Sequence, residues 1–401
     1  MTRPITGRVA PEQRRTFGAP APGQSAVPAP GTARIAVDLL GGDHAPAVVV
    51  VGALRAVQAD PALHLLLVGP VEAAGAVLAA LAPADRARVR AITAPADRAD
   101  LARVTPRAEG VRLDADQPSK PPAPPPPRPS DASPDPAARR PSEASRRPGA
   151  PPDPATTAGE RPTRVAESWV ESGVRAAVLA VAQGHADAVV SAGNTGATVT
   201  SAALGLGRWP DVRRPALAAV LPTVAGRLIL LDVGSSVDPD EQTLAMHARL
   251  GAGYARIGHD VAAPRVGLLT IGTERGKGDR LRRAAPAVLA ATTLPAGRYV
   301  GLVEGNDVVT GATADVVVTD GFTGNILLKG LETAYARVGS PNAETPPRAA
   351  VLLGVSGTVV VCHGAADAAD LADGIALAAT LHRRGAVPAI AALMADNEVT
   401  G

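Results

Sequence analysis

Short apolar runs, mostly of β-branched residues, alternate with stretches rich in Ala and Leu along most of this chain. This alternation restricts the possible fold more than any other feature. Runs that are apolar throughout are typical of strands buried on both faces, and the stretches between them have the length of helices. The sequence therefore predicts an α/β/α architecture, in which a mainly parallel sheet carries helices on both faces.

The expected elements can be placed along the chain. Strands are expected at Ile35–Leu39, Leu63–Val68, Ala188–Ser191, Ala216–Leu221, Leu228–Val233, Arg265–Thr270, Val300–Val303, Val316–Thr319 and Thr358–Val361. Helices are expected at Ala47–Gln58, Val71–Leu81, Val165–Gln183, Glu241–Ile257, Leu281–Ala291, Asn325–Val338 and Ala366–Leu381.

Two segments have too few apolar residues to build a core. Residues 1–33 are rich in Pro, Gly, Ala and Arg, and residues 115–164 contain no Val, Ile, Leu, Met, Phe, Tyr or Trp. Such a composition cannot offset the entropy lost on ordering. We expect a disordered N-terminal tail over 1–33 and one domain over 34–401, interrupted by a disordered Pro-rich insertion over 105–164. The insertion resembles SH3-type ligands in part, but solvated chain is the stronger interpretation.

Charge and composition exclude several classes of protein. The net charge is +2, but the tail and residues 103–164 hold most of the excess Arg, which leaves the remainder at −5. With only 2% aromatic residues, a basic face with stacking aromatics is not evident, so no nucleic-acid role is expected. A single cysteine, Cys362, excludes internal disulfides and multi-cysteine metal sites. No apolar run reaches membrane-spanning or signal-peptide length, so we expect a cytoplasmic protein, at most peripheral at the membrane.

The turns that follow the predicted strands carry polar residues beside glycines. Six such turns are Gly41-Gly42-Asp43-His44-Ala45-Pro46, Gly193-Asn194-Thr195-Gly196, Gly234-Ser235-Ser236-Val237-Asp238, Gly272-Thr273-Glu274-Arg275-Gly276-Lys277-Gly278, Asp320-Gly321-Phe322-Thr323-Gly324-Asn325 and Cys362-His363-Gly364. In a parallel α/β sheet the carboxyl ends of the strands share one edge, where glycines and helix N-termini can receive an anion. The six turns therefore predict one anion-binding crevice on a shared edge of the sheet.

Nucleotide sites are disfavoured by the spacing of these glycines. Gly272 to Gly278 is one residue short of a P-loop and has no Ser or Thr after Lys277. No Gly-x-Gly-x-x-Gly follows a predicted strand. We expect neither a cofactor nor a metal.

Several of these motifs together resemble the bacterial phosphate acyltransferase (PlsX) family of glycerophospholipid synthesis. The matching stretches are Arg34–Asp38 with Gly41–Pro46, Ser191–Gly196, Arg214–Ala216 with Leu221–Thr223, Leu231–Gly234, Arg265–Leu269 with Gly272–Glu274, Lys277 and Gly278, and Ala314–Asn325. They run from about 34 to 332 apart from the insertion, and a weaker match covers 351–384.

The resemblance implies an activity, a fold and partners. Such enzymes transfer a fatty acyl group from acyl carrier protein to inorganic phosphate, and the acyl-phosphate feeds phospholipid synthesis. Their fold is similar to isocitrate and isopropylmalate dehydrogenases and to phosphotransacetylases, and they act as homodimers. Contact with the membrane or with a downstream acyltransferase is also implied.

Attack of phosphate on a thioester requires positioning and charge stabilisation rather than a nucleophilic side chain. The candidate catalytic residues are Lys277, as a charge contact to phosphate or oxyanion, Asn194 as a neutral donor, and Asp43 with His44 as an oriented imidazole that could donate to an anion or protonate the leaving sulfur. Each has a plainer interpretation: a solvated loop lysine, a turn formed by Asn194, or a helix cap at Asp43. Lys329 has surface and functional interpretations of equal weight.

The predicted substrate-binding residues come from the same turns. They are Gly42, Gly193, Thr195, Gly196, Asp232, Gly234, Thr273, Glu274, Gly278, Asp320, Thr323, Gly324, Asn325 and His363. Asp232 and Asp320 are expected to orient neighbouring groups, because carboxylates would repel phosphate.

Three departures from the family pattern leave alternatives open. Val165–Ser172 replaces a cationic stretch, His363-Gly-Ala-Ala-Asp367 lacks two hydroxyls, and Gly339–Pro347 replaces a long helical hairpin. One alternative is a phosphotransacetylase-like enzyme that uses acyl-CoA. Another is a non-catalytic paralogue that binds acyl carrier protein, or a partner through the Pro-rich arm.

Overall fold

The computed structural model describes residues 31–93, 173–274, 276–342 and 348–396. Residues 1–30 of the predicted tail, the whole predicted insertion 105–164, and residues 165–172 of one predicted helix lie outside these ranges. Within the described part of the chain, no helix combines the length and the apolar character that crossing a membrane requires.

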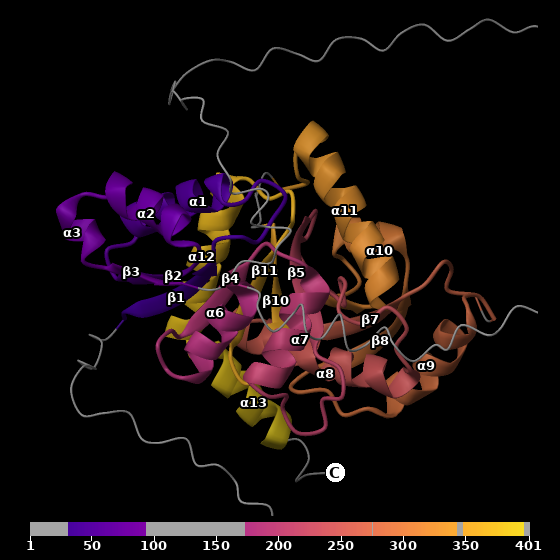
Figure 1. Ribbon diagram of the computed structural model, residues 1–401. Coiled ribbons are helices and arrows are strands. Elements are labelled where there is room, and N and C mark those ends of the chain that lie inside the picture. Colours follow the sequence, from indigo (N-terminus) through magenta and orange to yellow (C-terminus); the bar gives the residue numbers. More distant parts are fainter. Residues whose placement is uncertain (1–30, 94–172, 275, 343–347, 397–401) are drawn as a thin grey trace, which may run out of the picture.

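The elements follow the predicted alternation of strands and helices (Figure 1). The first part contains β1 (Ala33–Asp38), α1 (Ala47–Ala59), β2 (Leu63–Gly69), α2 (Val71–Ala80), α3 (Pro83–Arg86) and β3 (Val89–Thr93). The middle contains α6 (Gly173–Ala182), β4 (Ala188–Ser191), α7 (Thr195–Gly205), β5 (Ala216–Thr223), β6 (Gly226–Leu231), α8 (Glu241–Gly258), β7 (Arg265–Leu269) and α9 (Arg280–Ala291). The last part contains β8 (Arg298–Val303), α10 (Gly305–Thr310), β9 (Val316–Val318), α11 (Gly321–Val338), β10 (Ala349–Leu353), β11 (Thr358–Cys362), α12 (Ala368–Arg383) and α13 (Ala386–Asp396).

The described strands form one sheet of eleven, in the order β3-β2-β1-β4-β11-β10-β5-β6-β9-β7-β8. Seven of the ten neighbouring pairs are parallel, which confirms the prediction of a mainly parallel sheet. The three antiparallel pairs, β11–β10, β10–β5 and β5–β6, lie together in the middle.

These central pairs reverse the direction of the sheet. Strands β1, β4 and β11 run one way and β6, β9 and β7 run the other, so the two groups have their carboxyl ends at opposite edges. The prediction that all six turns share one edge is therefore wrong. The cause is the short connection between β5 and β6, where Thr223 pairs with Gly226: a hairpin can be this short, but a parallel crossover cannot.

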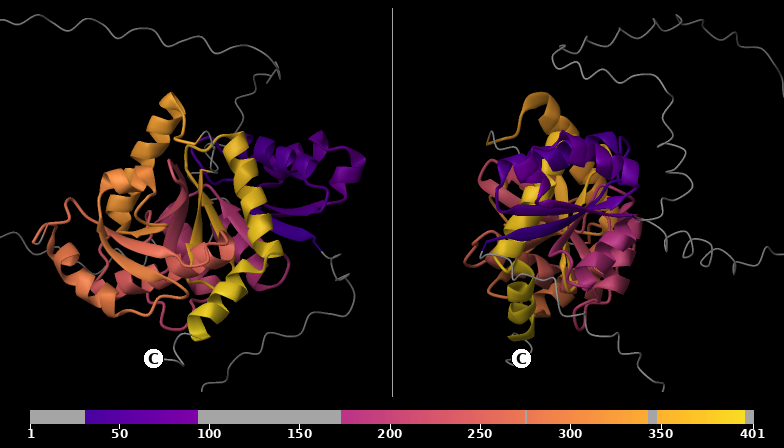
Figure 2. Two further views of the ribbon diagram at one scale, coloured as in Figure 1. Left: turned by 180° about the vertical axis from the view of Figure 1, so that it is seen from behind. Right: turned by 60° about the vertical axis from the view of Figure 1, so that its left-hand side comes forward.

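Helices cover both faces of the sheet, as predicted, and each face has its own core (Figure 2). Alternate strand residues point to opposite faces. Ile35 and Val37 pack in the core that contains α1, α8, α12 and α13, whereas Ala36 packs in the core that contains α6 and α7. Helix α11 contributes partly buried leucines to this second core, and it leaves room for a pocket between itself and the central strands.

Candidate active site

A pocket of about 430 Å³ lies between the central antiparallel strands and α11. Its floor is apolar and includes Leu217, Ala219 and Leu221, which alternate along β5 and therefore share one face of the sheet. Its other wall is one side of α11, where residues spaced by three, four or seven positions face the same way. The lining side of α11 consists of Asn325, Leu328, Glu332, Tyr335 and Ala336.

The two halves of the sheet meet at this pocket even though their strands end at opposite edges. Gly234 follows β6 at a φ of 142°, and a Cβ placed there would lie 4.0 Å from both Thr195 Cγ2 and Asn325 Cγ. Thr195 follows β4, which belongs to one half of the sheet, and Asn325 follows β9, which belongs to the other half. The twist of a sheet raises diagonally opposed corners toward the same side, which accounts for this meeting.

Three of the predicted site residues line the pocket: Thr195, Asn325 and His363. Together with the adjacent Gly234 they come from four of the six turns. A shared cleft therefore exists, but it lies on a face of the sheet rather than along an edge.

The flank of the pocket beside β11 carries ionisable side chains. His363 follows β11, and its backbone N–H donates to the carbonyl of Arg348, 3.3 Å away, which also lines the pocket. The Arg348 guanidinium has Asp370 at 3.8 Å, and its side chain is 40% exposed. Across the pocket, burial raises the pKa of Glu332, although Arg348 and Lys329 oppose the shift.

The turns after β1 and β4 pack against each other behind this flank. The Asp43 N–H donates to the Gly364 carbonyl at 2.7 Å, while the Asp43 and His44 side chains are exposed. Ser191 donates to the buried Asp38 at 2.8 Å and accepts from the Gly193 N–H at 3.0 Å. The expectation that Asp43 orients His44 toward a substrate group stays a prediction, and neither residue lines the pocket.

The other predicted residues of these two turns have backbone roles. Asn194 is the N-cap of α7 and accepts from the Ala197 N–H at 2.9 Å. Gly42 lies so close to the next turn that an added Cβ would meet the Gly364 carbonyl at 3.2 Å. Gly193 and Gly196 are the neighbours of this cap, and none of these four residues lines the pocket.

After β6, Asp232 is fully enclosed and its carboxylate accepts four backbone N–H groups. The donors are Leu217, Gly234, Ser235 and Ser236, at 3.0, 3.1, 2.9 and 2.6 Å. Asp232 therefore shapes the turn that presents Gly234 to the pocket, which agrees with the expectation that it orients neighbouring groups.

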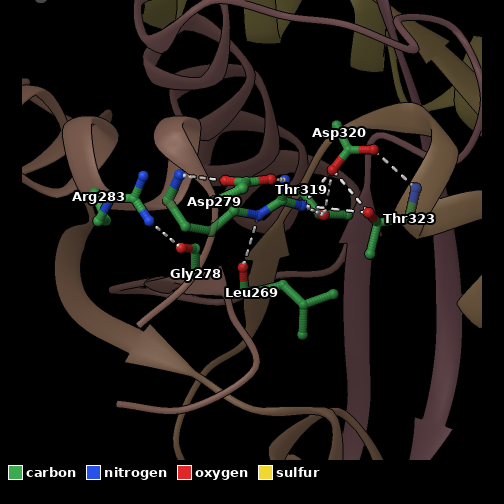
Figure 3. Close-up of polar contacts among 8 residues, drawn as sticks. Leu269, Gly278, Asp279, Arg283, Thr319, Asp320 and Thr323 are labelled. Atoms are coloured by element: carbon green, nitrogen blue, oxygen red, sulfur yellow. Dashed lines mark hydrogen bonds and ion pairs between the residues drawn. The ribbon is translucent and has the colours of Figure 1, made fainter. Parts of the chain in front are cut away.

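After β9, Asp320 caps α11 and is bonded by a residue that the sequence analysis did not single out. Asp320 accepts from the Thr323 N–H and hydroxyl, each at 2.8 Å (Figure 3). It also accepts from the Arg282 guanidinium. Arg282 also donates to Thr319 Oγ1 at 2.9 Å and to Asp279 at 2.8 Å. Although burial opposes it, these donors hold the pKa of Asp320 below its usual range.

The turns after β6 and β9 are locked together. A Cβ at Gly324 would collide with the backbone carbonyl of Asp232, and a Cβ at Gly321 would meet the Ser236 carbonyl at 2.9 Å. Only glycine allows this approach, which fixes the first turn of α11 and hence Asn325 beside Gly234.

The turn after β7 lies apart from the pocket lining. Thr273, Glu274 and Lys277 are exposed, and Gly278, at a φ of 86°, packs against Arg282. Lys277 does not line the pocket; among the lining residues the cation is Arg348. Two cations were thus missed from sequence: Arg348, which lines the pocket, and Arg282, which holds the Asp320 cap of α11. For Arg282 a signal existed, because three arginines begin α9, where the helix dipole disfavours cations.

Cys362 also lines the pocket but is buried, and burial raises the pKa of its thiol to about 12. A thiol with that pKa is a poor nucleophile at neutral pH. Among the described residues there is no group of three or more His, Cys, Asp or Glu placed to hold a metal ion.

Comparison with known proteins identifies the family. The family model described as fatty acid synthesis protein matches residues 33–97 and 155–344, more than half of the chain. The chain belongs to this family. Its relatives include the phosphate acyltransferase of Thermobifida fusca, 45% identical over 230 residues that cover 50% of this chain and 64% of that protein. The phosphate acyltransferase of Phenylobacterium zucineum is 33% identical over 378 residues, which cover 88% and 90%. The resemblance drawn from the motifs is confirmed.

Solved structures agree on the fold. A phosphotransacetylase from Streptococcus pyogenes superposes with a TM-score of 0.53 at 18% identity, covering 88% of this chain and 94% of that one. The EutD phosphotransacetylase from Staphylococcus aureus gives 0.51 at 16% identity, covering 88% and 96%. The phosphotransacetylase part of the predicted likeness is confirmed, and the isocitrate dehydrogenase part stays a prediction.

Proposed function

We propose that this protein transfers a fatty acyl group from the thioester of acyl carrier protein to inorganic phosphate, giving acyl-phosphate for phospholipid synthesis. The observation that carries the proposal is the composition of the pocket. One continuous space joins an apolar floor with neutral donors at Thr195, Asn325 and His363 and a guanidinium at Arg348. The names of the relatives support acyl transfer to phosphate.

The reaction needs what these residues provide. A phosphate oxygen forms a bond to the thioester carbonyl carbon, and the carbonyl oxygen becomes an oxyanion. The intermediate then re-forms the C=O bond and releases the thiolate with the electron pair of the C–S bond. Fixed donors that stabilise the oxyanion, and a cation that holds phosphate, lower the barrier without a covalent enzyme intermediate.

The apolar part of the pocket fits the alkyl chain. From Asn325 to Tyr335 the wall of α11 extends about 15 Å at 1.5 Å per residue, which matches a long acyl chain. Tyr335 stands toward the far end of this wall, with its hydroxyl 3.5 Å from the Pro222 carbonyl oxygen. Burial of methylene groups along Leu217, Ala219 and Leu221 would supply binding energy.

The decisive test is turnover of acylated carrier protein in the presence and absence of phosphate. We expect thiol release that depends on phosphate and matches the acyl-phosphate trapped with hydroxylamine. A folded sample that releases no thiol with phosphate would refute the proposal. Running acyl-CoA in parallel separates the two donors, and preference for acyl-CoA would favour a phosphotransacetylase-like enzyme.

A matched pair of variants tests whether the pocket holds the acyl chain. Ala336 and Ala334 are both exposed on α11, but only Ala336 lines the pocket. Ala336→Trp should lower kcat/KM for a long-chain donor by about tenfold, the equivalent of roughly 1.4 kcal/mol, and spare a short-chain donor. Ala334→Trp should leave both rates unchanged. Equal effects of the two substitutions would place the chain elsewhere.

We further propose a cytoplasmic homodimer with peripheral membrane or acyltransferase contacts, as the family resemblance implies. Exposed apolar residues on α11 support an interface there: Phe322 is 60% exposed, Ile326 58% and Val338 83%. Sedimentation of the full chain measures the assembly, and a monomer at micromolar concentration would contradict it.

A further inference from the structure

His363 has one ring nitrogen already engaged by the protein backbone. The Ala365 N–H lies 3.1 Å from His363 Nδ1, and a backbone N–H can only donate. Nδ1 must therefore carry a lone pair, and the proton of the neutral ring must sit on Nε2. His363 lines the pocket, so this tautomer makes Nε2–H the group it can offer to a ligand.

The surroundings keep the ring neutral. Burial lowers the pKa of His363 below its ordinary value, and the charges of Lys329 on α11 and Arg348 before β10 lower it further. Asp43 after β1 and Asp370 on α12 oppose this shift without cancelling it. Protonation would also destroy the hydrogen bond from Ala365, since a protonated Nδ1 cannot accept.

A neutral imidazole in this tautomer can stabilise charge but cannot act as an acid toward sulfur. Giving up the Nε2 proton would leave an imidazolate, which is a far stronger base than a thiolate, whose thiol has a pKa near 8.5 in general. A hydrogen bond from Nε2–H to an oxyanion has no such obstacle, and triosephosphate isomerase uses a neutral histidine in this way.

We propose that His363 donates its Nε2–H to the thioester carbonyl oxygen as it becomes an oxyanion, and that it does not protonate the leaving sulfur. The inference rests on the proposed function and specifies one residue of it. The C–S electron pair leaves on the thiolate, which takes its proton from water. This differs from the prediction drawn from the sequence, in which His44 was the histidine expected to donate to an anion or to protonate the sulfur.

Two acyl donors, an alkyl and an aryl thioester, and three variants test the assignment. His363→Ala should lower kcat by about 10²–10³-fold, as loss of an oxyanion donor does, and by the same factor for an alkyl thioester and for an aryl thioester with a better leaving group. His363→Gln, which restores an N–H donor, should recover at least about tenfold of the loss. His185→Gln, on an exposed histidine outside the pocket, is the control and should match wild type. Thermal unfolding of each variant checks that it is folded.

The pH dependence and the NMR spectrum give further readouts. The ratio of wild-type to His363→Gln activity should stay constant above pH 7, since the ring is neutral above the ordinary imidazole pKa of about 6.5 and its Nε2–H donor does not change there. Taking the ratio removes the effect of phosphate ionisation on the rate, because this effect is the same for both enzymes. The ¹⁵N imidazole spectrum of the wild type, assigned with His363→Gln, should show an unprotonated Nδ1 and a protonated Nε2.

Several results would overturn the assignment. One is rescue of His363→Ala by the aryl thioester, which would indicate an acid. Others are a ratio that falls as pH rises above 7, or a proton on Nδ1. Full activity of His363→Ala would remove the inference while leaving the proposed function intact. Only an inactive wild type would remove both.

Discussion

The polar residues beneath the start of α11 and those on the flank of the pocket are built differently. Beneath α11, Asp232 accepts four backbone N–H groups, and Asp320 is bonded by Arg282 and Thr323. On the flank, among the residues that the structure describes, Arg348 has one ion-pair partner, at 3.8 Å, and His363 uses one of its two ring nitrogens. In the first region the polar groups hold the structure together, whereas in the second they can still bind a ligand. Substitutions in the first should change stability, and those in the second should change turnover.

The largest expected effect follows from removing Arg282. Its side chain is 10% exposed and that of Asp320 is 8% exposed, so Arg282→Met would leave a buried carboxylate without its cation. We expect a loss of about 3–5 kcal/mol in the free energy of unfolding, measured by urea denaturation. Arg280→Met is the matched control, because Arg280 is 84% exposed, and it should cost less than about 0.5 kcal/mol. Similar losses for both variants would contradict the comparison.

The same variant has a defined pH dependence. The pKa of Asp320 is held below its usual range, so its contribution to stability is present above pH ~4 and is lost as the pH falls through the folded pKa. Without Arg282 the carboxyl should take up a proton more readily. The stability gap between wild type and Arg282→Met should therefore narrow from pH 7 to pH 4 in the same denaturation series, and a constant gap would argue against an ion pair.

Asp232→Asn should have the next largest effect. The amide NH₂ would face at least one of the four backbone N–H groups that the carboxylate now satisfies, which should cost about 2–3 kcal/mol of stability. Asp238→Asn, in the exposed part of the same loop, is the control. Loss of turnover in Asp232→Asn without loss of stability would instead place Asp232 among the residues that contact substrate.

Much of the architecture was predictable, because buried strands appear in the sequence as short apolar runs. The direction of the strands in the sheet and some of the elements were not predicted. The hairpin was readable in principle: six residues between Leu221 and Leu228 are too few for a crossover. Helix α7 was missed because Thr195-Gly-Ala-Thr-Val-Thr-Ser resembles a turn or a strand, and only the Asn194 cap and packing make it helical. Strand β10 was missed because it follows a link that was expected to remain loop. Helix α11 begins four residues before the predicted start.

The candidate site was predictable only in part. Glycine turns pointed to Thr195, Gly234, Asn325 and His363, because ligands of α/β sheets bind beyond the carboxyl ends of strands, where these turns lie. Arg348 could not be distinguished from the many exposed arginines, because burial and proximity depend on tertiary packing, whereas Arg282 carried one signal, its place among three arginines at the start of α9. Tertiary packing also decides the exposure of Lys277. Its motif is specific to the family, but the sequence could not show that its side chain is exposed.

On the flank of the pocket, Arg348→Ala should raise the KM for phosphate by about tenfold, as expected for a lost hydrogen bond to a charged group of roughly 1.5 kcal/mol, with little change in stability. Lys277→Ala tests the residue that the sequence favoured. A larger rise in the KM for phosphate with Lys277→Ala than with Arg348→Ala would place the phosphate site at the turn after β7.

The smallest effect is expected at Glu332. Its raised pKa means that ionisation is disfavoured in the folded state, so it lowers stability as the pH rises above about 4.3. Glu332→Gln should remove this dependence and add on the order of 0.3 kcal/mol at pH 7 after solvent screening. It should also lower the KM for phosphate slightly. Equal stability of Glu332→Gln and wild type at every pH between 4 and 7 would contradict the raised pKa of Glu332.

The order of strands has a consequence for biosynthesis. Strands β10 and β11 are among the last to be made, yet they lie in the middle of the sheet, between β4 and β5. Until they are synthesised, β4 and β5 are apolar edges that lack a neighbour on that side, the kind of edge that can pair with another chain. A nascent chain that stalls before residue 362 would hold two half-sheets and no pocket, and it would depend on chaperones to stay apart from its neighbours.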